Sequence, residues 1–127
     1  MGELIKMTKK IKIYYYPKCT TCKRALKWLE ENNAECEKKD IKEQPPIFEE
    51  MKEIYKKSGL PLKKFFNTSG LVYKELKLKD KLADMSEDEQ LKLLCSNGML
   101  IKRPLVIGND FILVGFKENE WEKVFKN

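Results

Sequence analysis

The two cysteines Cys19 and Cys22 constrain this chain most, because they lie between two different predicted elements. Residues 11–16 are apolar and aromatic, which predicts a strand that ends before Pro17. Residues 21–32 repeat apolar side chains at helical spacing, which predicts an amphipathic helix. The first turn of a helix carries partial positive charge and free N–H groups, so it favours a thiolate over a thiol. The sequence therefore predicts sulfur chemistry at a strand-to-helix junction.

The remaining strands are predicted near the two ends of the chain. A second strand over about 34–40 completes a strand–helix–strand unit, whose length favours a right-handed crossover and a parallel pair. The runs 105–107 and 111–114 predict a hairpin, and the spacing of Trp121 and Phe125 predicts a closing helix. The order is thus βαβ and later ββα. This order predicts the α/β class, with a four-stranded mixed sheet flanked by helices.

The middle of the chain is predicted to be helical and irregular, as an insertion over about 41–103. Pro45 and Pro46 are expected to open one of its helices, and Gly59 is expected to close that helix as a left-handed cap. With 127 residues the chain is long enough for one compact core. We therefore expect a single domain over 1–127.

Composition bounds the partners and the location of the protein. The chain is 42% hydrophobic and 36% charged, and it contains no apolar stretch near the roughly 20 residues that cross a membrane. Its first residues lack the apolar core and cleavage site of a signal peptide. The net charge of +6 comes from interspersed lysines rather than from a long basic block. We expect a cytoplasmic protein that binds neither membranes nor nucleic acid directly.

A cytosolic cysteine pair is more often catalytic, redox-sensing or metal-binding than structural. Zinc would need four ligands, whereas the chain has no histidine, and its other two cysteines, Cys36 and Cys95, are isolated. We therefore expect no metal site and interpret Cys36 and Cys95 as inert buried thiols. Two readings of Cys22 are left, a redox thiol or a small core residue of the first helix. The position of the pair favours the redox reading.

The two thiols are expected to have different roles. Cys19 lies nearer the exposed end of the helix, where Lys18, Lys23 and Arg24 add positive charge, so it is expected to attack. Cys22 lies one turn further into the helix. It is expected to resolve the reaction, closing a disulfide after Cys19 has been oxidised or has formed a mixed disulfide.

Arg103 and Pro104, just before the third strand, have two readings. Proline is common at the start of a strand, so the dipeptide can be a simple edge of the hairpin. Alternatively, a cis Arg103–Pro104 bond brings the loop against the cysteines, with the guanidinium over the thiolate or a bound anion. The chain contains only two arginines, which draws attention to Arg103.

Taken together, these motifs resemble the arsenate reductase-related (ArsC/Spx) family, a branch of the thioredoxin fold with a helical insertion. The resemblance covers about 11–126, and its matching segments are residues 15–23, 65–73, 96–104 and 114–116. It implies that Cys19 is the reactive cysteine and that Arg103 assists it beside a cis-proline, Pro104.

The chain departs from arsenate reductases of this type at the site itself. Those enzymes usually have serine and arginine where Cys22 and Lys23 stand, and they hold the oxyanion with three arginines. Only Arg103 is available here, and Asn67 falls about where another arginine is expected. We therefore expect a thiol–disulfide oxidoreductase, with Lys23, Asn67 and Pro104 in support. It would use no bound cofactor and would exchange electrons with glutathione, glutaredoxin or thioredoxin.

The Spx-like branch of the family gives the alternative. Its members carry the same cysteine pair as a redox switch and bind the C-terminal domain of the RNA polymerase α subunit. The glycine that contacts polymerase follows their second helix, and Gly59 occupies a comparable place. The alternative function is therefore a redox-sensing transcriptional regulator.

Overall fold

The structure, a computed structural model, describes residues 11–125, and these fall into two compact units. The sheet unit combines the described residues up to Asp40 with those from Arg103 onward. The helical unit spans Ile41–Lys102, the stretch predicted as an insertion. The single domain over 1–127 stays a prediction.

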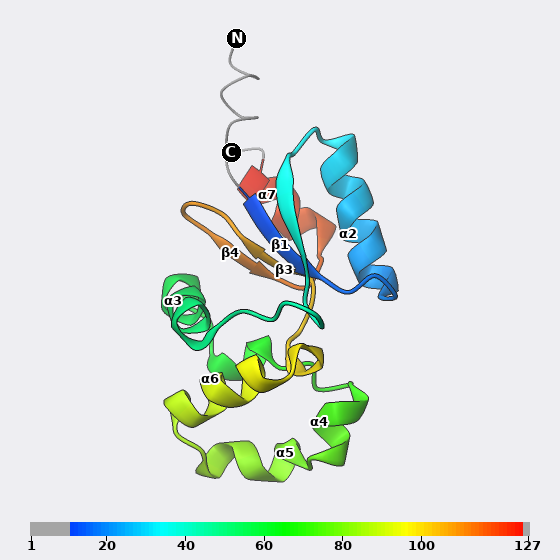
Figure 1. Cartoon of the computed structure of the whole chain (residues 1–127). Helices are drawn as coiled ribbons and strands as arrows, with labels where there is room; N and C mark the ends of the chain where they lie inside the picture. The colour runs from blue at the N-terminus through cyan, green and yellow to red at the C-terminus, as the bar shows by residue number, and fades with distance from the viewer. Residues whose placement is uncertain (1–10, 126–127) are drawn as a thin grey trace. The chain divides into compact units, whose positions relative to one another are not determined.

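The sheet unit is built on four strands, β1 (Ile11–Tyr15), β2 (Cys36–Asp40), β3 (Leu105–Ile107) and β4 (Ile112–Val114). Their order across the sheet is β2-β1-β3-β4 (Figure 1). The β1–β2 pair is parallel, whereas β1–β3 and β3–β4 are antiparallel. The predicted four-stranded, thioredoxin-like mixed sheet is thus confirmed, with strand ends that differ from the expected ones by one or two residues.

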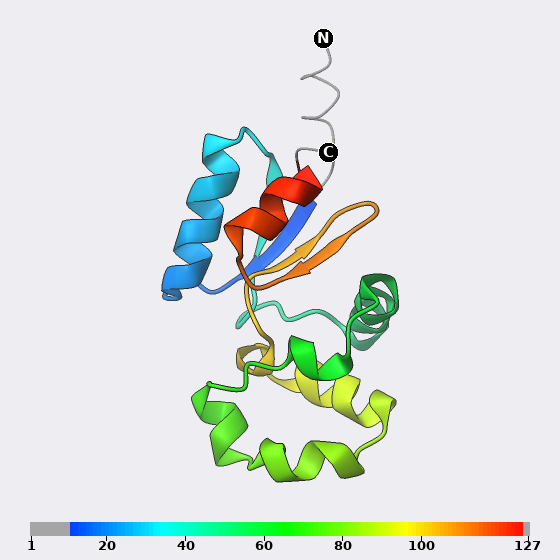
Figure 2. The ribbon, with the colours of Figure 1, turned by 180° about the vertical axis from the view of Figure 1, so that it is seen from behind.

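Two helices, α2 (Thr20–Glu31) and α7 (Glu118–Phe125), cover one face of this sheet (Figures 1 and 2). The side chains of α2 that enter the core recur every three or four residues, which is the spacing of one helix face. The core cluster consists of Ile11, Ile13, Ala25, Trp28, Leu29, Val106, Leu113 and Trp121. Packing against these helices fixes the start of α2, and therefore the cysteines, relative to β1.

Trp121 is the largest fully buried side chain in this core. It meets Phe116 and Trp28 edge to face, with ring centroids 4.7 Å and 5.7 Å away. Its indole N–H donates a hydrogen bond of 3.2 Å to the carbonyl of Gly115. Gly115 has φ +79°, a left-handed conformation that glycine adopts readily, and it joins β4 to α7.

The helical unit contains three α-helices of four to eleven residues before α6, together with short 3₁₀ turns. Its elements are α3 (Phe48–Ser58), η1 (Leu62–Phe65), α4 (Leu71–Glu75), α5 (Leu78–Lys81), η2 (Leu82–Asp84), α6 (Glu87–Ser96) and η3 (Gly98–Leu100). Helix α6 begins with a complete capping box between Ser86 and Glu89. No helix within residues 11–125 is long and apolar enough to cross a membrane.

The predicted end of α3 is confirmed, but its predicted start is wrong. Gly59 caps the helix in the left-handed conformation, with φ +67°. Pro45 and Pro46 lie before the helix instead of in its first turn, and Ile47 is the N-cap. A proline disfavours helical geometry at the residue before it, so the second proline helps to keep the first out of the helix.

Gly98 lies against the backbone of Ile41 within the helical unit. A Cβ atom on Gly98 would lie 1.8 Å from the carbonyl oxygen of Ile41, which is far inside contact distance. The backbone approach is therefore possible only because residue 98 has no side chain.

Candidate functional site

Cys19 lies at the N-cap of α2, directly after the turn that follows β1. Its backbone N–H donates to the carbonyl of Tyr16 at 3.0 Å, and its own carbonyl accepts from the N–H of Lys23 at 3.0 Å. Its backbone is extended, so its side chain lies at the start of the helix, where the first N–H groups have no partner within the helix. All four cysteines of the chain are free thiols.

The environment of Cys19 favours the thiolate. Partial burial opposes ionisation. Four contacts outweigh this effect: the backbone N–H and the thiol of Cys22, the charge of Arg103, and the backbone N–H of Thr21. These contacts hold the pKa of Cys19 below its ordinary value. The predicted location of a reactive thiol at the positive end of a helix is therefore consistent with the local electrostatics.

Cys22 has the opposite character. Its side chain is buried, and burial raises its pKa to about 12, aided by the hydrogen bond to Cys19 and the charge of that neighbour. The backbone N–H of Tyr16, 3.5 Å from the sulfur, and the charge of Arg103 act in the other direction but do not offset burial. One turn of helix thus holds two thiols whose pKa values are shifted in opposite directions, lowered at Cys19 and raised at Cys22.

The Arg103–Pro104 peptide bond is cis, as the second of the two readings requires, whereas the position of the guanidinium over the thiolate or a bound anion stays a prediction. The guanidinium of Arg103 lies over the ring of Tyr16, with 5.2 Å between Cζ and the ring centroid. Its Nε and Nη1 atoms are buried and have no hydrogen-bond partner among the described residues. Since buried donors are nearly always paired, two unpaired ones beside a reactive thiol mark a position where an anion can bind.

Pro104 is buried and its carbonyl accepts a hydrogen bond of 2.8 Å from the N–H of Gly115. This contact ties the residue after Arg103 to the segment between β4 and α7. The supporting role expected of Pro104 stays a prediction.

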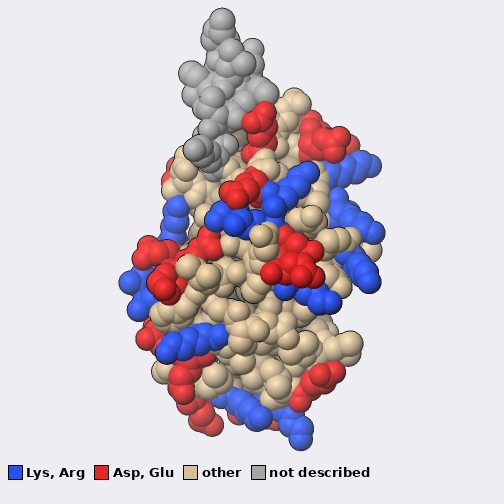
Figure 3. All heavy atoms as spheres, viewed as in Figure 1, with Lys and Arg blue, Asp and Glu red and all other residues tan. Residues whose placement is uncertain are grey.

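The charged residues of α2 are arranged against the dipole of the helix. Lys23 and Arg24 lie in its N-terminal half, while Glu30 and Glu31 lie at its C-terminal end. There is no acidic residue in the first turn and no basic residue in the last. Each such reversal at a helix end costs about 0.3–1 kcal/mol at low salt. In Figure 3, basic side chains gather along the edge where α2 lies in Figure 1, with acidic ones near its upper end.

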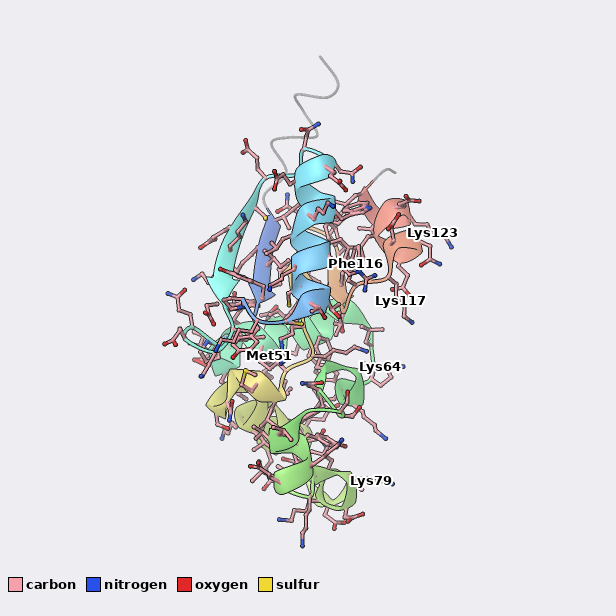
Figure 4. The ribbon with its side chains drawn as sticks, turned by 90° about the vertical axis from the view of Figure 1, so that its right-hand side faces the viewer. Met51, Lys64, Lys79, Phe116, Lys117 and Lys123 are labelled. Carbon is pink, nitrogen blue, oxygen red and sulfur yellow. The ribbon has the colours of Figure 1, made fainter. Side chains whose placement is uncertain are left out.

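Arg24 rests on an aromatic ring rather than on a carboxylate. Its Cζ lies 5.4 Å from the centroid of Phe116. Figure 4 shows Phe116 and the neighbouring Lys117 beside the N-terminal half of α2. Lys117 is largely exposed and lies 3.8 Å from Glu120.

Two of the predicted site residues, Asn67 and Gly59, belong to the helical unit. The N–H of Asn67 donates to the carbonyl of Leu100 at 2.7 Å, and its carbonyl accepts from Gly70 at 3.0 Å. Gly59 is exposed, and a side chain there would meet no atom within 4 Å. The roles of these two residues, and the support expected from the exposed Lys23, stay predictions.

The other two thiols differ from Cys19 and Cys22. Burial raises the pKa of Cys36, and burial together with the charges of Glu50 and Glu49 raises the pKa of Cys95 to about 11. Both are half-buried and neutral under ordinary conditions. Within residues 11–125, no three histidine, cysteine, aspartate or glutamate side chains are placed to hold a metal ion together.

The comparison with known protein families agrees with this geometry. The model of the ArsC family matches residues 14–124, which is most of the chain. The chain belongs to the ArsC family. Among related sequences, the uncharacterized protein YusI of Bacillus subtilis (strain 168) is 61% identical over 110 residues, covering 87% of this chain and 93% of YusI.

A solved structure and a regulatory protein are also similar to this ArsC family member. The crystal structure of an ArsC family related protein from Bacteroides fragilis has a TM-score of 0.86 and 55% identity, covering 90% of this chain and 96% of that one. The regulatory protein MgsR of Bacillus subtilis is 27% identical over 120 residues, covering 94% of both chains. The resemblance stated from the sequence is confirmed.

Tyr16 and Phe116 are the site residues that sequence reasoning missed in this ArsC family member. Tyr16 contacts both Arg103 and Cys22, and Phe116 contacts Arg24. One feature of the sequence could have pointed to these contacts. The chain has only two arginines among many lysines, and arginine is the better residue for contacting an aromatic ring or a planar anion.

Proposed function

We propose that this ArsC family member is a thiol–disulfide oxidoreductase in which Cys19 attacks and Cys22 resolves. The opposite shifts of the two thiols support this function, since the pKa is lowered at Cys19 and raised to about 12 at Cys22. Only a thiolate is an effective nucleophile, so the first attack falls to Cys19. The cytoplasmic location and the lack of a bound cofactor stay predictions.

The reaction proceeds in two exchanges. The thiolate of Cys19 attacks one sulfur of a substrate disulfide, forms a mixed disulfide and releases the other sulfur as a thiolate with its electron pair. Cys22 then loses its proton to solvent and attacks the sulfur of Cys19, which closes the Cys19–Cys22 disulfide and releases the second substrate thiol. Two electrons pass from the protein to the substrate. A thiol partner of the glutathione, glutaredoxin or thioredoxin class returns the pair to the reduced form.

Trapping of the mixed disulfide tests this assignment. Reduced Cys22→Ser protein treated with a small disulfide should accumulate one adduct on Cys19, detected by mass spectrometry after proteolysis. Cys19→Ser protein should form no rapid adduct, and Cys36→Ser is a matched control that should react like the natural protein. Rapid exchange that survives in Cys19→Ser would refute the proposal.

A redox-sensing regulator is the second candidate, and the similarity to MgsR over nearly the full length of both chains favours it. In this case oxidation of Cys19 and Cys22 changes a surface that binds the C-terminal domain of the RNA polymerase α subunit, with Gly59 as a contact. A pull-down with that domain, using reduced and oxidised protein, separates the two candidates. Failure to bind in either state would end the regulatory reading.

A further inference from the structure

The cations next to Cys19 in the sequence have no carboxylate partner among residues 11–125. Lys18, Lys23 and Arg24 are exposed, and no carboxylate of residues 11–125 lies within ion-pair distance of them. Three other lysines in the described part of the chain do lie within 4 Å of a carboxylate, namely Lys39, Lys52 and Lys117. The charge next to the reactive thiol is thus left available to an outside group.

Arg24 is also held in place without using its hydrogen-bond donors. Its guanidinium lies over Phe116, which is fixed edge to face against the fully buried Trp121. A guanidinium stacked on a ring keeps the N–H groups in its plane free, and this fork matches the two oxygens of a carboxylate. The contact with Phe116 thus leaves the donors of Arg24 available to the two oxygens of a carboxylate.

Lys23 lies one helical turn from Cys19, since its N–H donates to the carbonyl of Cys19. The Lys23 side chain is exposed and extends from the turn of helix that follows Cys19. The positive end of α2 adds to its charge, and no acidic side chain in the first turn offsets it. A substrate that approaches Cys19 thus meets several positive charges together.

We propose that Lys23 and Arg24 bind carboxylates that flank the disulfide attacked by Cys19. This inference rests on the proposed function and specifies its substrate class. The preferred disulfides carry negative charge close to their sulfur atoms, whereas cationic disulfides are disfavoured. The exchange chemistry remains that described above, with the substrate disulfide as the oxidant.

Three small disulfides of similar size test the proposal with the reduced full-length chain. Dithiodipropionate carries two carboxylates, bis(hydroxyethyl) disulfide is neutral, and cystamine carries two ammonium groups. Each single-turnover rate constant is divided by that for a free cysteine derivative, which removes the intrinsic reactivity of the disulfide. We expect the dianion to react roughly tenfold faster than the dication at low ionic strength. In about 1 M KCl the two rates should converge, because the Debye length falls to about 3 Å.

Charge-neutralising variants locate the effect. Lys23→Gln and Arg24→Gln should each lower the dianion-to-dication ratio by roughly twofold to fivefold, whereas Lys38→Gln, an exposed lysine in β2, should leave it unchanged. Any change in the ionisation of Cys19 alters all three rates equally and cancels in the ratio. Arg24→Lys keeps the charge but loses the planar fork, so its ratio should fall between those of Arg24→Gln and the natural protein.

Peptide disulfides distinguish the two sources of such a substrate, a small molecule and an acidic protein segment. Mixed disulfides of peptides with glutamates or with lysines around the cysteine are compared in the same way. A preference for the acidic member in either the small or the peptide series supports the inference. Equal ratios in the natural protein and in both Gln variants would overturn it while leaving the oxidoreductase function intact. Failure of Cys19 to exchange with any disulfide would instead remove the function itself.

Discussion

The guanidinium of Arg103 lies over the ring of Tyr16, 5.2 Å from its centroid, and the backbone N–H of the same tyrosine donates to the sulfur of Cys22. One residue of the turn after β1 therefore contacts both the arginine and the resolving thiol. Arg103 contacts a ring and has no carboxylate partner within residues 11–125, and its charge helps to lower the pKa of Cys19.

Replacing Arg103 with glutamine should raise the pKa of Cys19, because one of the contributions that lower it is removed. The rate of alkylation by iodoacetamide follows the thiolate fraction, so its pH midpoint should move upward in Arg103→Gln. Arg24→Gln is the matched control, since Arg24 is not among the groups that shift Cys19. An unchanged midpoint in Arg103→Gln would show that the arginine does not act on the thiol.

Cys95 should make the reduced protein less stable at high pH. Its folded pKa is raised to about 11, so the folded state keeps a proton that the unfolded state loses at its ordinary value of about 8.5. The stabilising contribution is complete below that ordinary value and disappears as the pH rises toward 11. Denaturant unfolding of Cys95→Ala should therefore lose less stability across this window than the natural protein. Ser96→Ala should show the natural slope, and a Cys95→Ala slope equal to it would contradict the prediction.

Gly98→Ala should destabilise the helical unit by about 1–3 kcal/mol or more, because its Cβ would collide with the carbonyl of Ile41. The relevant measurement is the midpoint of urea unfolding. Gly59→Ala is the comparison variant. Its new Cβ would meet no atom within 4 Å, but the left-handed backbone with φ +67° would be strained, so it reports backbone strain without a collision. It should cost about 1–2 kcal/mol. A Gly98→Ala protein as stable as the natural one would mean that the helical unit adjusts freely at this contact.

Trp121→Ala should cost about 3–5 kcal/mol, because it removes a fully buried ring that packs on Trp28 and Phe116. Trp121→Phe should cost less, since it retains an aromatic ring but leaves the carbonyl of Gly115 without its indole donor. Thermal or denaturant unfolding ranks the two variants. Equal losses would indicate that the hydrogen bond, and not the packing, dominates this contact.

The strands and the first helix could be predicted because their apolar residues recur with clear periods. Ile11, Ile13, Ala25 and Leu29 all lie in the core, as the periodicity required. The start of α3 was predicted wrongly, because Pro46 disfavours helical backbone angles at Pro45 and the helix begins only at Phe48. Proline statistics for a first helical position do not include that effect.

At the site, the sequence located the cysteines and Arg103 but not the aromatic rings that the two arginines contact. The position of Cys19 at a helix start follows from local pattern, and the structure agrees. The contact between Arg24 and Phe116 joins segments far apart in the chain, and no local period reports such a pair. The same holds for Tyr16 and Arg103, which become neighbours only when β1 and β3 pair.

That pairing has a consequence for the newly synthesised protein. The cysteine pair leaves the ribosome long before Arg103, because the entire helical unit is translated between them. A growing chain therefore carries the dithiol without the guanidinium that promotes its ionisation. The contribution of Arg103 to the lowered pKa of Cys19 is therefore present only after synthesis has passed residue 103 and β3 has paired with β1.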